Sequence, residues 1–189
     1  LAHGQRRIAG LGEPRLEMLR YYVTNRHGCD VLATAELAIA SGIDMIQIRE
    51  KDLTSRELLD LVRRIAGIAE DSPTRVLVND RLDIARAAGV SGVHLPQNGL
   101  PAASVRPLVD ILGVSTHTKE EVRDAEAAGA DFVVFGPIFD TPGKTAVGLD
   151  RLREVSAAVR IPVLAIGGIT ERNTPLVVEA GAAGIAAIR

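Results

Sequence analysis

A recurring glycine spacing limits the fold of this chain more than any other feature of its sequence. At four places an alanine-containing segment ends in a glycine and a new apolar run begins three residues later; these glycines are Gly42, Gly89, Gly129 and Gly181. Each phrase is typical of a helix that ends at a left-handed glycine and turns back into a strand. The recurrence predicts a fold built from repeated strand–helix units.

Apolar runs and amphipathic segments alternate along the chain from residue 19 onward. Runs rich in Val and Ile predict strands over residues 19–24, 45–49, 75–79, 92–95, 111–115, 132–136, 163–166 and 184–188. Segments with helical spacing of apolar residues separate them, over residues 33–41, 55–68, 80–88, 102–109, 118–128, 149–159 and 173–180. Each step from strand to strand is long enough for a parallel crossover helix.

Eight such units favour a closed (β/α)8 TIM barrel, an α/β fold in a single domain, because eight parallel strands enclose a space that their own side chains fill. A doubly wound open sheet is the alternative, but no G-x-G-x-x-G motif follows the first predicted strand. We expect residues 1–18 to form an N-terminal arm and residues 19–189 to form the barrel. The chain ends at Arg189 on the eighth strand, so we expect the final helix to be absent from it.

The composition fits such a barrel and argues against several classes of protein. Hydrophobic residues make up 47% of the chain but aromatic residues only 3%, so the core must be aliphatic, as in parallel sheets buried on both faces. A net charge of −2 gives no bulk attraction to nucleic acid or anionic membranes. The single Cys29 excludes an internal disulfide and a cysteine cluster for metal. No apolar run approaches the ~18 residues of a membrane span, so we expect a cytoplasmic enzyme.

Polar residues close the second predicted strand in an alternating pattern. Gln47, Arg49 and Lys51 would share one side of the strand. Functional side chains of a (β/α)8 barrel lie at the C-terminal ends of its strands, and unpaired charges are costly to bury in its core. The pattern predicts a cationic cradle for phosphate at the mouth of the barrel. An internal salt bridge from Arg49 or Lys51 to Asp80 is the structural alternative.

Three further strand ends carry polar residues. Asn79 and Asp80 follow the third strand; Asp80 could bind Mg²⁺ together with substrate phosphates, or either residue could cap the next helix. His94 lies within an apolar run, which favours a buried, hydrogen-bonded imidazole over a catalytic base. Ser115 ends the fifth strand and could present its hydroxyl at the mouth.

The loops after the sixth and seventh strands have the composition of ligand-binding loops. Residues 136–144 are rich in Gly and Pro and include Thr141 and Lys144. This loop could fold over a ligand with Lys144 against a phosphate, although an ordinary mobile loop is the alternative. Gly167 and Gly168 would let backbone N–H groups approach a ligand, at the usual phosphate site of this fold.

Taken together, these motifs resemble the thiamine phosphate synthase family, which also includes the TenI-type thiazole tautomerases. The resemblance runs in order from about Tyr21 to Arg189 and rests on residues 47–51, 78–81, 92–95, 113–115, 136–144 and 165–169. It implies a transferase of thiamine biosynthesis with small phosphorylated substrates. The enzyme would join hydroxymethylpyrimidine pyrophosphate to thiazole phosphate, release pyrophosphate and use Mg²⁺.

The resemblance also implies a role for each site residue. Arg49, Lys51 and Lys144 would be catalytic, because they would stabilise the negative charge that builds on the leaving pyrophosphate. Asp80 would be a Mg²⁺ ligand. The substrate-binding residues would be Gln47, Asn79, Ser115, Thr141, Gly167 and Gly168. We also expect a homodimer, as for many compact barrels.

Several positions depart from the pattern of the family. Gly99 stands where synthases carry a second Mg²⁺-binding Asp, Gly143 where they carry a second hydroxyl before the lysine, and Arg189 where a Ser is expected. Pro137 takes the place of the proton-transferring His of the tautomerases. Two alternatives to the synthase therefore stay open: a thiazole tautomerase that works without metal, and a non-catalytic protein that binds thiazole phosphate or thiamine phosphate.

Overall fold

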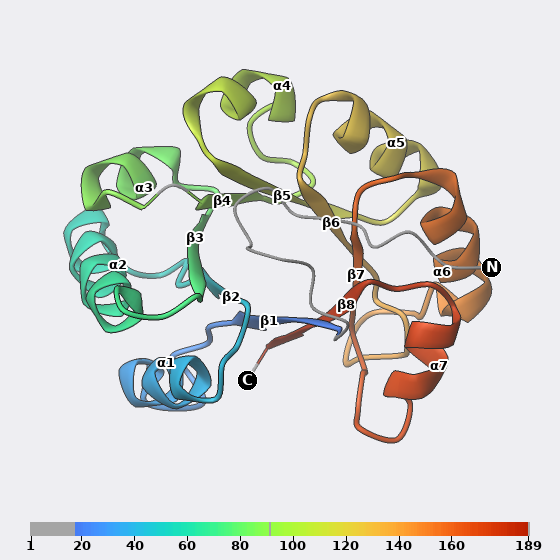
Figure 1. Ribbon diagram of the computed structural model, residues 1–189, viewed down its shortest axis with the longest axis horizontal. Helices are drawn as coiled ribbons and strands as arrows, with labels where there is room; N and C mark the ends of the chain where they lie inside the picture. Colours follow the sequence, from blue (N-terminus) through green and yellow to red (C-terminus); the bar gives the residue numbers. More distant parts are fainter. Residues whose placement is uncertain (1–17, 91, 189) are drawn as a thin grey trace.

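The computed structural model describes residues 18–90 and 92–188, which form a closed barrel of parallel strands in sequence order (Figure 1). The strands are β1 (Leu19–Val23), β2 (Met45–Ile48), β3 (Arg75–Asn79), β4 (Gly92–Leu95), β5 (Ile111–Thr116), β6 (Phe132–Phe135), β7 (Val163–Ile166) and β8 (Gly184–Ile188). β8 pairs with β1 from Leu19↔Gly184 to Val23↔Ile188, which closes the barrel. The predicted (β/α)8 barrel is confirmed and the open sheet is excluded.

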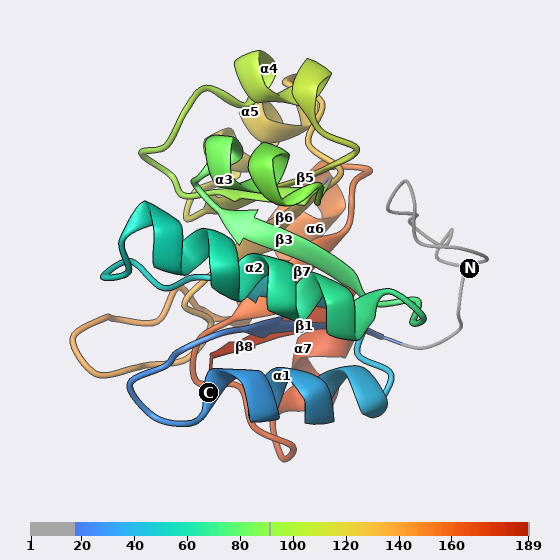
Figure 2. The same cartoon turned by 90° about the vertical axis from the view of Figure 1, so that its left-hand side faces the viewer.

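Helices surround the barrel and connect successive strands (Figures 1 and 2). Those of the described residues are α1 (Val31–Ala40), α2 (Ser55–Ala69), α3 (Leu82–Ala88), α4 (Ala102–Val105), the 3₁₀ helix η1 (Arg106–Leu108), α5 (Lys119–Ala127), α6 (Gly148–Ala158) and α7 (Thr174–Glu179). Within this part of the chain, no helix is both long and apolar enough to cross a membrane. The four glycines of the repeated phrase all have positive φ, between 73° and 94°, which confirms the predicted left-handed turns.

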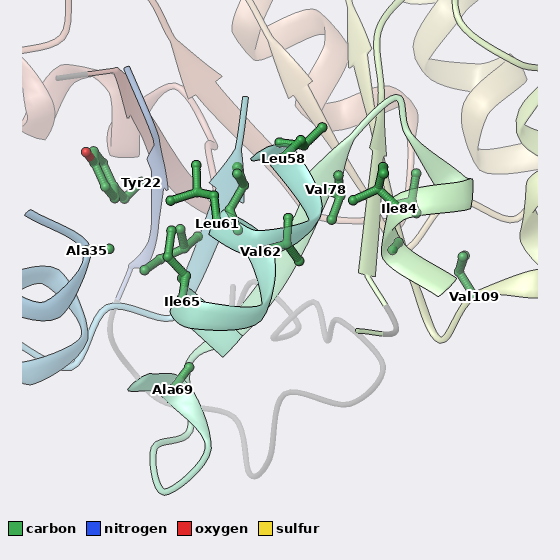
Figure 3. Packing of buried hydrophobic residues seen from close by; sticks show 14 of the residues in the cluster. Tyr22, Ala35, Leu58, Leu61, Val62, Ile65, Ala69, Val78, Ile84 and Val109 are labelled. Atoms are coloured by element: carbon green, nitrogen blue, oxygen red, sulfur yellow. The ribbon is translucent and has the colours of Figure 1, made fainter. Parts of the chain in front are cut away.

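The amino-terminal turn and the apolar stripe of α2 follow directly from its sequence. Thr54 and Glu57 form a capping box, in which each side chain accepts a backbone N–H of the other residue. The buried residues Leu58, Leu61, Val62 and Ile65 recur at helical spacing on one face. Figure 3 shows this face packed toward Val78 of β3 and Ile84 of α3.

The core has two layers, inside and outside the barrel wall. Alternate strand residues point inward and form a cluster that includes Tyr21, Met45, Leu77 and Phe132. The intervening residues point outward and pack under the helices, in one cluster toward α1 to α4 and another toward α5 to α7. Because Met45 is inside and Ile46 and Ile48 are outside, Gln47 faces the barrel interior, as its alternation predicted.

Most predicted boundaries are correct to within one or two residues, and three of those that differ concern elements near the site or a divided helix. The helix expected over 102–109 divides into α4 and η1, because Pro107 has no N–H to continue the α-helical ladder. β5 extends to Thr116, so Ser115 lies within the strand. α3 begins at Leu82 and not at residue 80. The predicted arm, residues 1–18, lies outside the described residues apart from Met18, and so does Arg189.

Candidate active site at the mouth of the barrel

Every predicted site residue lies at or just beyond the C-terminal end of a strand. The end of β2 and the loop after it carry Gln47, Arg49 and Lys51. The end of β3 carries Asn79 and Asp80, and the penultimate residue of β5 is Ser115. The remaining residues lie in the loops after β6 and β7; they are Thr141, Lys144, Gly167 and Gly168. Parallel strands of a closed barrel end at one rim, so the fold gathers these residues on one side of the molecule.

A pocket of about 300 Å³ opens between the ends of β2, β3 and β4. Lys51, Asn79, Asp80 and Asn98 contribute polar groups to its wall. The other lining residues are Ile48, Glu50, Leu53, Leu58, Arg81 and Pro96. The pocket therefore brings the predicted cation of the β2 loop and the predicted metal ligand of β3 to one cavity.

The charges of this pocket differ in how far they are neutralised. Arg81 forms an ion pair with Asp83, with 2.6 Å between its Nη2 and Oδ2 of the carboxylate. Neither Arg49 nor Lys51 forms an ion pair with Asp80 or with any other residue from 18 to 188 that the structure describes. The internal salt bridge considered as the structural alternative is therefore not observed. Lys51 is exposed and available to a ligand.

Glu50 lies between Arg49 and Lys51 in the sequence and is only 5% exposed. Its Oε2 accepts the backbone N–H of Arg26 at 3.1 Å. Its Oε1 is enclosed and has no hydrogen-bond partner among the described residues. Because this oxygen is closed off from solvent, Asp80 is the exposed carboxylate of the pocket wall.

One interpretation of the sequence is that Asp80 caps α3, and the structure excludes it. The N-cap residue is Arg81, and no side chain donates or accepts there as a cap. Asp80 instead has φ of 62°, an uncommon left-handed conformation for a residue other than glycine, and its N–H donates to the carbonyl of His94 at 2.9 Å. The backbone thus holds this carboxylate at the pocket.

The residues around Asp80 suit a hard cation that brings other ligands with it. A Cβ atom built on Gly99 would lie 3.0 Å from Asp80 Oδ1, so position 99 is adjacent to the carboxylate. Among the described residues there is no cluster of three or more acidic, His or Cys side chains suited to a metal. One carboxylate with the Asn79 and Asn98 amides is the donor set that remains, and Mg²⁺ commonly binds through one or two carboxylates plus substrate phosphates.

A chain of hydrogen bonds crosses the interior of the barrel just below the mouth. Gln47 Nε2 donates to the Tyr21 hydroxyl at 3.0 Å, the Tyr21 hydroxyl lies 3.3 Å from His94 Nδ1, and His94 Nε2 lies 2.9 Å from Ser115 Oγ. Tyr21 and His94 are each 1% exposed. The prediction of a buried, hydrogen-bonded imidazole is confirmed.

Burial keeps both rings of this chain neutral. Desolvation, with a smaller contribution from the nearby Arg49 charge, lowers the pKa of His94 to about 3. Desolvation raises the pKa of Tyr21, and the hydrogen bond from Gln47 offsets this only in part. Neither residue is therefore a proton donor or acceptor in the neutral pH range.

The loop after β6 is held by backbone hydrogen bonds to the end of β7. Thr141 and Lys144 exchange two backbone hydrogen bonds, of 3.2 and 2.9 Å, which close a tight turn. Ile138 N–H donates to the carbonyl of Ile166 at 2.8 Å and Phe139 N–H to that of Gly167 at 3.1 Å. The Lys144 side chain is exposed. The loop is thus anchored on β7, and Lys144 extends from its turn.

The two glycines after β7 are required by this anchoring. Gly167 and Gly168 have φ of 95° and 64°. Added Cβ atoms would lie 2.4 Å from Cβ of Pro137 and 2.7 Å from Cβ of Phe139. Larger residues would therefore push the β6 and β7 loops apart. Asn173 supports the second glycine by donating from Nδ2 to its carbonyl at 2.9 Å.

Sequence reasoning missed the part that Tyr21 plays beneath the site. A tyrosine in the centre of a buried strand is a usable signal, because a buried phenol needs a hydrogen-bond partner. In the loop after β4, Gln97 Nε2 donates to Oε1 of Glu121 at 2.6 Å. Asn98, its neighbour, does line the pocket.

Comparisons with known proteins agree with the motifs. The family described as thiamine monophosphate synthase matches residues 20–189. A protein of Geobacter sulfurreducens, provisionally named a thiamine-phosphate synthase, is 45% identical and covers 92% of this chain and 86% of its own. The thiamine-phosphate synthase of Moorella thermoacetica is 41% identical, over 95% of this chain and 81% of its own.

A solved structure gives the same result in three dimensions. The thiamine phosphate pyrophosphorylase of Pyrococcus furiosus superposes with a TM-score of 0.84 at 32% identity, covering 90% of this chain and 85% of its own. A 3-hexulose-6-phosphate synthase, at 18% identity and a TM-score of 0.67, shares the fold alone.

Proposed function

Because the chain belongs to the thiamine monophosphate synthase family, we propose that it is a transferase that joins hydroxymethylpyrimidine pyrophosphate to thiazole phosphate and releases pyrophosphate. The observation that carries this proposal is the pocket in which Lys51 and Asp80, neither of them ion-paired among the described residues, meet Asn79 at the barrel mouth. A site for pyrophosphate needs cationic groups and a metal ligand within reach of the same phosphates.

The proposed chemistry moves one bond from oxygen to nitrogen. The C–O bond between the pyrimidine methylene and pyrophosphate breaks, and its electrons leave with pyrophosphate. The thiazole nitrogen then donates its lone pair to the resulting cation and forms the C–N bond. Negative charge grows on the leaving group, so fixed cations aimed at it lower the barrier.

The residues of this chain would divide the work as follows. Arg49, Lys51 and Lys144 would bind the pyrophosphate oxygens and stabilise the leaving group. Asp80 would hold Mg²⁺, which, when bound, supplies further charge neutralisation on the phosphates. Gln47, Asn79 and Ser115 would orient the pyrimidine half. Thr141, Gly167 and Gly168 would bind the thiazole phosphate.

An assay of thiamine phosphate formation tests the proposal. Purified protein is supplied with both substrates, with and without Mg²⁺, and the product is measured by a coupled fluorescence reaction. We expect product only when both substrates and Mg²⁺ are present. Absence of product from protein that is shown to be folded contradicts the proposal.

The alternatives differ in what the same sample would do. A thiazole tautomerase would isomerise the thiazole carboxylate phosphate without metal, which NMR detects. The position of its proton-transferring group is Pro137 here, and proline has no group that exchanges a proton. A non-catalytic protein would bind thiazole phosphate or thiamine phosphate and turn over neither substrate. The absence of a second carboxylate at Gly99 is the observation that keeps both tests necessary.

A further inference from the structure

The hydrogen-bond chain beneath the mouth has one half-buried end and three buried members. Gln47 on β2 and Ser115 on β5 are the ends, and both belong to the predicted ligand-binding set. Ser115 is half-buried, whereas Gln47 is 4% exposed and Tyr21 on β1 and His94 on β4 are each 1% exposed. Tyr21 and His94 therefore act on a ligand through Ser115.

The donors and acceptors of this chain favour one direction. An amide nitrogen is a donor, so Gln47 Nε2 donates to the Tyr21 oxygen. The other partner of the Tyr21 hydroxyl among the described residues is His94 Nδ1, so the single hydroxyl hydrogen is paired in this buried chain only if Nδ1 accepts it. A neutral imidazole carries one hydrogen, which must be on Nε2, and it donates to Ser115 Oγ. The hydroxyl hydrogen of Ser115 is left free to point at the mouth.

Packing holds the imidazole in the position that this direction requires. Phe132 lies edge-on to Tyr21, with ring centroids 5.4 Å apart at 84°, and 5.9 Å from the His94 ring. Gly113 makes room for this group, because a Cβ there would lie 2.7 Å from His94 Nδ1 and 2.4 Å from Phe132. The ring can therefore neither tilt away nor exchange partners at low cost.

We infer that Tyr21 and His94 are positioning residues. Tyr21 keeps His94 in the Nε2–H tautomer, and His94 in turn directs the Ser115 hydroxyl hydrogen toward an acceptor atom of the ligand. On the proposed function, that acceptor is a ring nitrogen of the pyrimidine or an oxygen of its pyrophosphate. The tautomer itself does not depend on the proposed function. A ligand atom that accepts a hydrogen bond at this point pairs the free Ser115 hydroxyl hydrogen, whereas a ligand that could only donate would leave that hydrogen unpaired.

Long-range ¹H–¹⁵N correlation spectra of the full chain, labelled with ¹⁵N at histidine, measure the tautomer directly. The His94 signals are identified by their absence in His94→Gln. We expect one protonated nitrogen, Nε2, from pH 5 to pH 8. A protonated Nδ1, or a doubly protonated ring in this range, overturns the inference whether or not the protein is an enzyme.

Tyr21→Phe removes the hydroxyl, with its hydrogen bonds to Gln47 and His94, and keeps the ring. We expect the Nδ1–H form of His94 to become populated in this variant. We also expect kcat/KM for the pyrimidine substrate to fall about tenfold, the size of one hydrogen bond from Ser115 to the ligand, with the KM for thiazole phosphate unchanged. An unchanged tautomer, or an equal loss toward both substrates, contradicts the assigned direction.

A pair of substitutions at position 94 separates positioning from packing. Gln can accept from Tyr21 with its oxygen and donate to Ser115 with its nitrogen, whereas Met can do neither. Circular dichroism first shows that both variants are folded. We then expect kcat/KM for the pyrimidine substrate to be about tenfold higher in His94→Gln than in His94→Met. Equal activity of the two variants overturns the inference. If wild-type protein forms no product but shows the expected tautomer, the proposed function fails and the positioning chain stands.

Discussion

At the scale of single residues, Gly99 is the departure with the clearest chemical consequence. Its Cβ position lies 3.0 Å from Asp80 Oδ1 and 2.9 Å from Cδ of Pro96. Its φ lies outside the positive region that side chains avoid, but the Cβ position is also 3.1 Å from the backbone oxygen of Pro96, so a carboxylate there requires Pro96 to shift. An aspartate at this position would therefore stand beside the carboxylate of Asp80.

We predict that Gly99→Asp tightens Mg²⁺ binding about tenfold, because a second carboxylate joins the first at one cation. Without metal, the two like charges should lower thermal stability, and Mg²⁺ should restore it. Calorimetric titration of Mg²⁺ in the presence of pyrophosphate measures the change. Gly99→Asn is the control, since it crowds Pro96 equally and adds no charge. Equal Mg²⁺ affinity in the two variants would contradict the prediction.

Lys144 provides a test of the cationic cradle. Its side chain is exposed and makes no ion pair within the described chain, so its removal should leave the fold intact. We predict that Lys144→Ala lowers kcat/KM for thiamine phosphate formation about 10²-fold, the effect of removing one charge-stabilising group. Lys119→Ala, in the first turn of α5 and outside the predicted site, should retain activity. Equal activities of the two variants would remove Lys144 from the mechanism.

At the scale of elements, the start of α2 is determined by two side chains. Thr54 Oγ1 accepts the N–H of Glu57, and Glu57 accepts the N–H of Thr54 at 2.9 Å. We predict that Thr54→Ala lowers the free energy of unfolding by about 1 kcal/mol, while Thr54→Ser, which keeps the hydroxyl, changes it little. Urea denaturation compares the variants. A Ser variant as unstable as the Ala variant would show that the cap does not cause the effect.

Helices and strands were predictable where the local signal was strong. The α2 capping box, the spacing glycines and the starts of β2 to β8 follow from residues close together in the sequence. The prediction failed where a residue interrupts the ladder, as Pro107 does between α4 and η1. At Asp80 the sequence left two interpretations open, and the left-handed conformation there excludes the helix cap.

At the scale of the whole molecule, His94 couples the barrel interior to pH. Its pKa is about 3 in the folded protein against 6.5 when unperturbed, because burial disfavours the charged ring. Below about pH 6.5 the unfolded chain takes up a proton that the folded chain excludes, so stability falls as the pH falls. This loss continues down to about pH 3, at about 1.4 kcal/mol per pH unit.

We predict that His94→Gln is less sensitive to acid than the wild-type protein. The wild-type free energy of unfolding should fall by about 2 kcal/mol more than that of the variant between pH 7.5 and pH 5. Urea denaturation at both pH values measures the free energy of unfolding of each protein. The carboxylates titrate in both proteins, so their contribution cancels when the variant is subtracted from the wild type. His117→Gln, at an exposed position, should behave as the wild type. Parallel loss in wild type and His94→Gln would contradict the assigned cause.

The sequence alone determined the order of strands and helices, the family motifs and the rim on which polar residues gather, because periodicity, caps and glycines act over a few neighbouring residues. It did not determine which polar groups meet. Gln47, Tyr21, His94 and Ser115 come from four strands, and Asp80 and Gly99 from two loops. The predicted homodimer likewise stays a prediction. Contacts between distant residues depend on closure of β8 onto β1 and on the stagger of the strands, so the tertiary structure decides them.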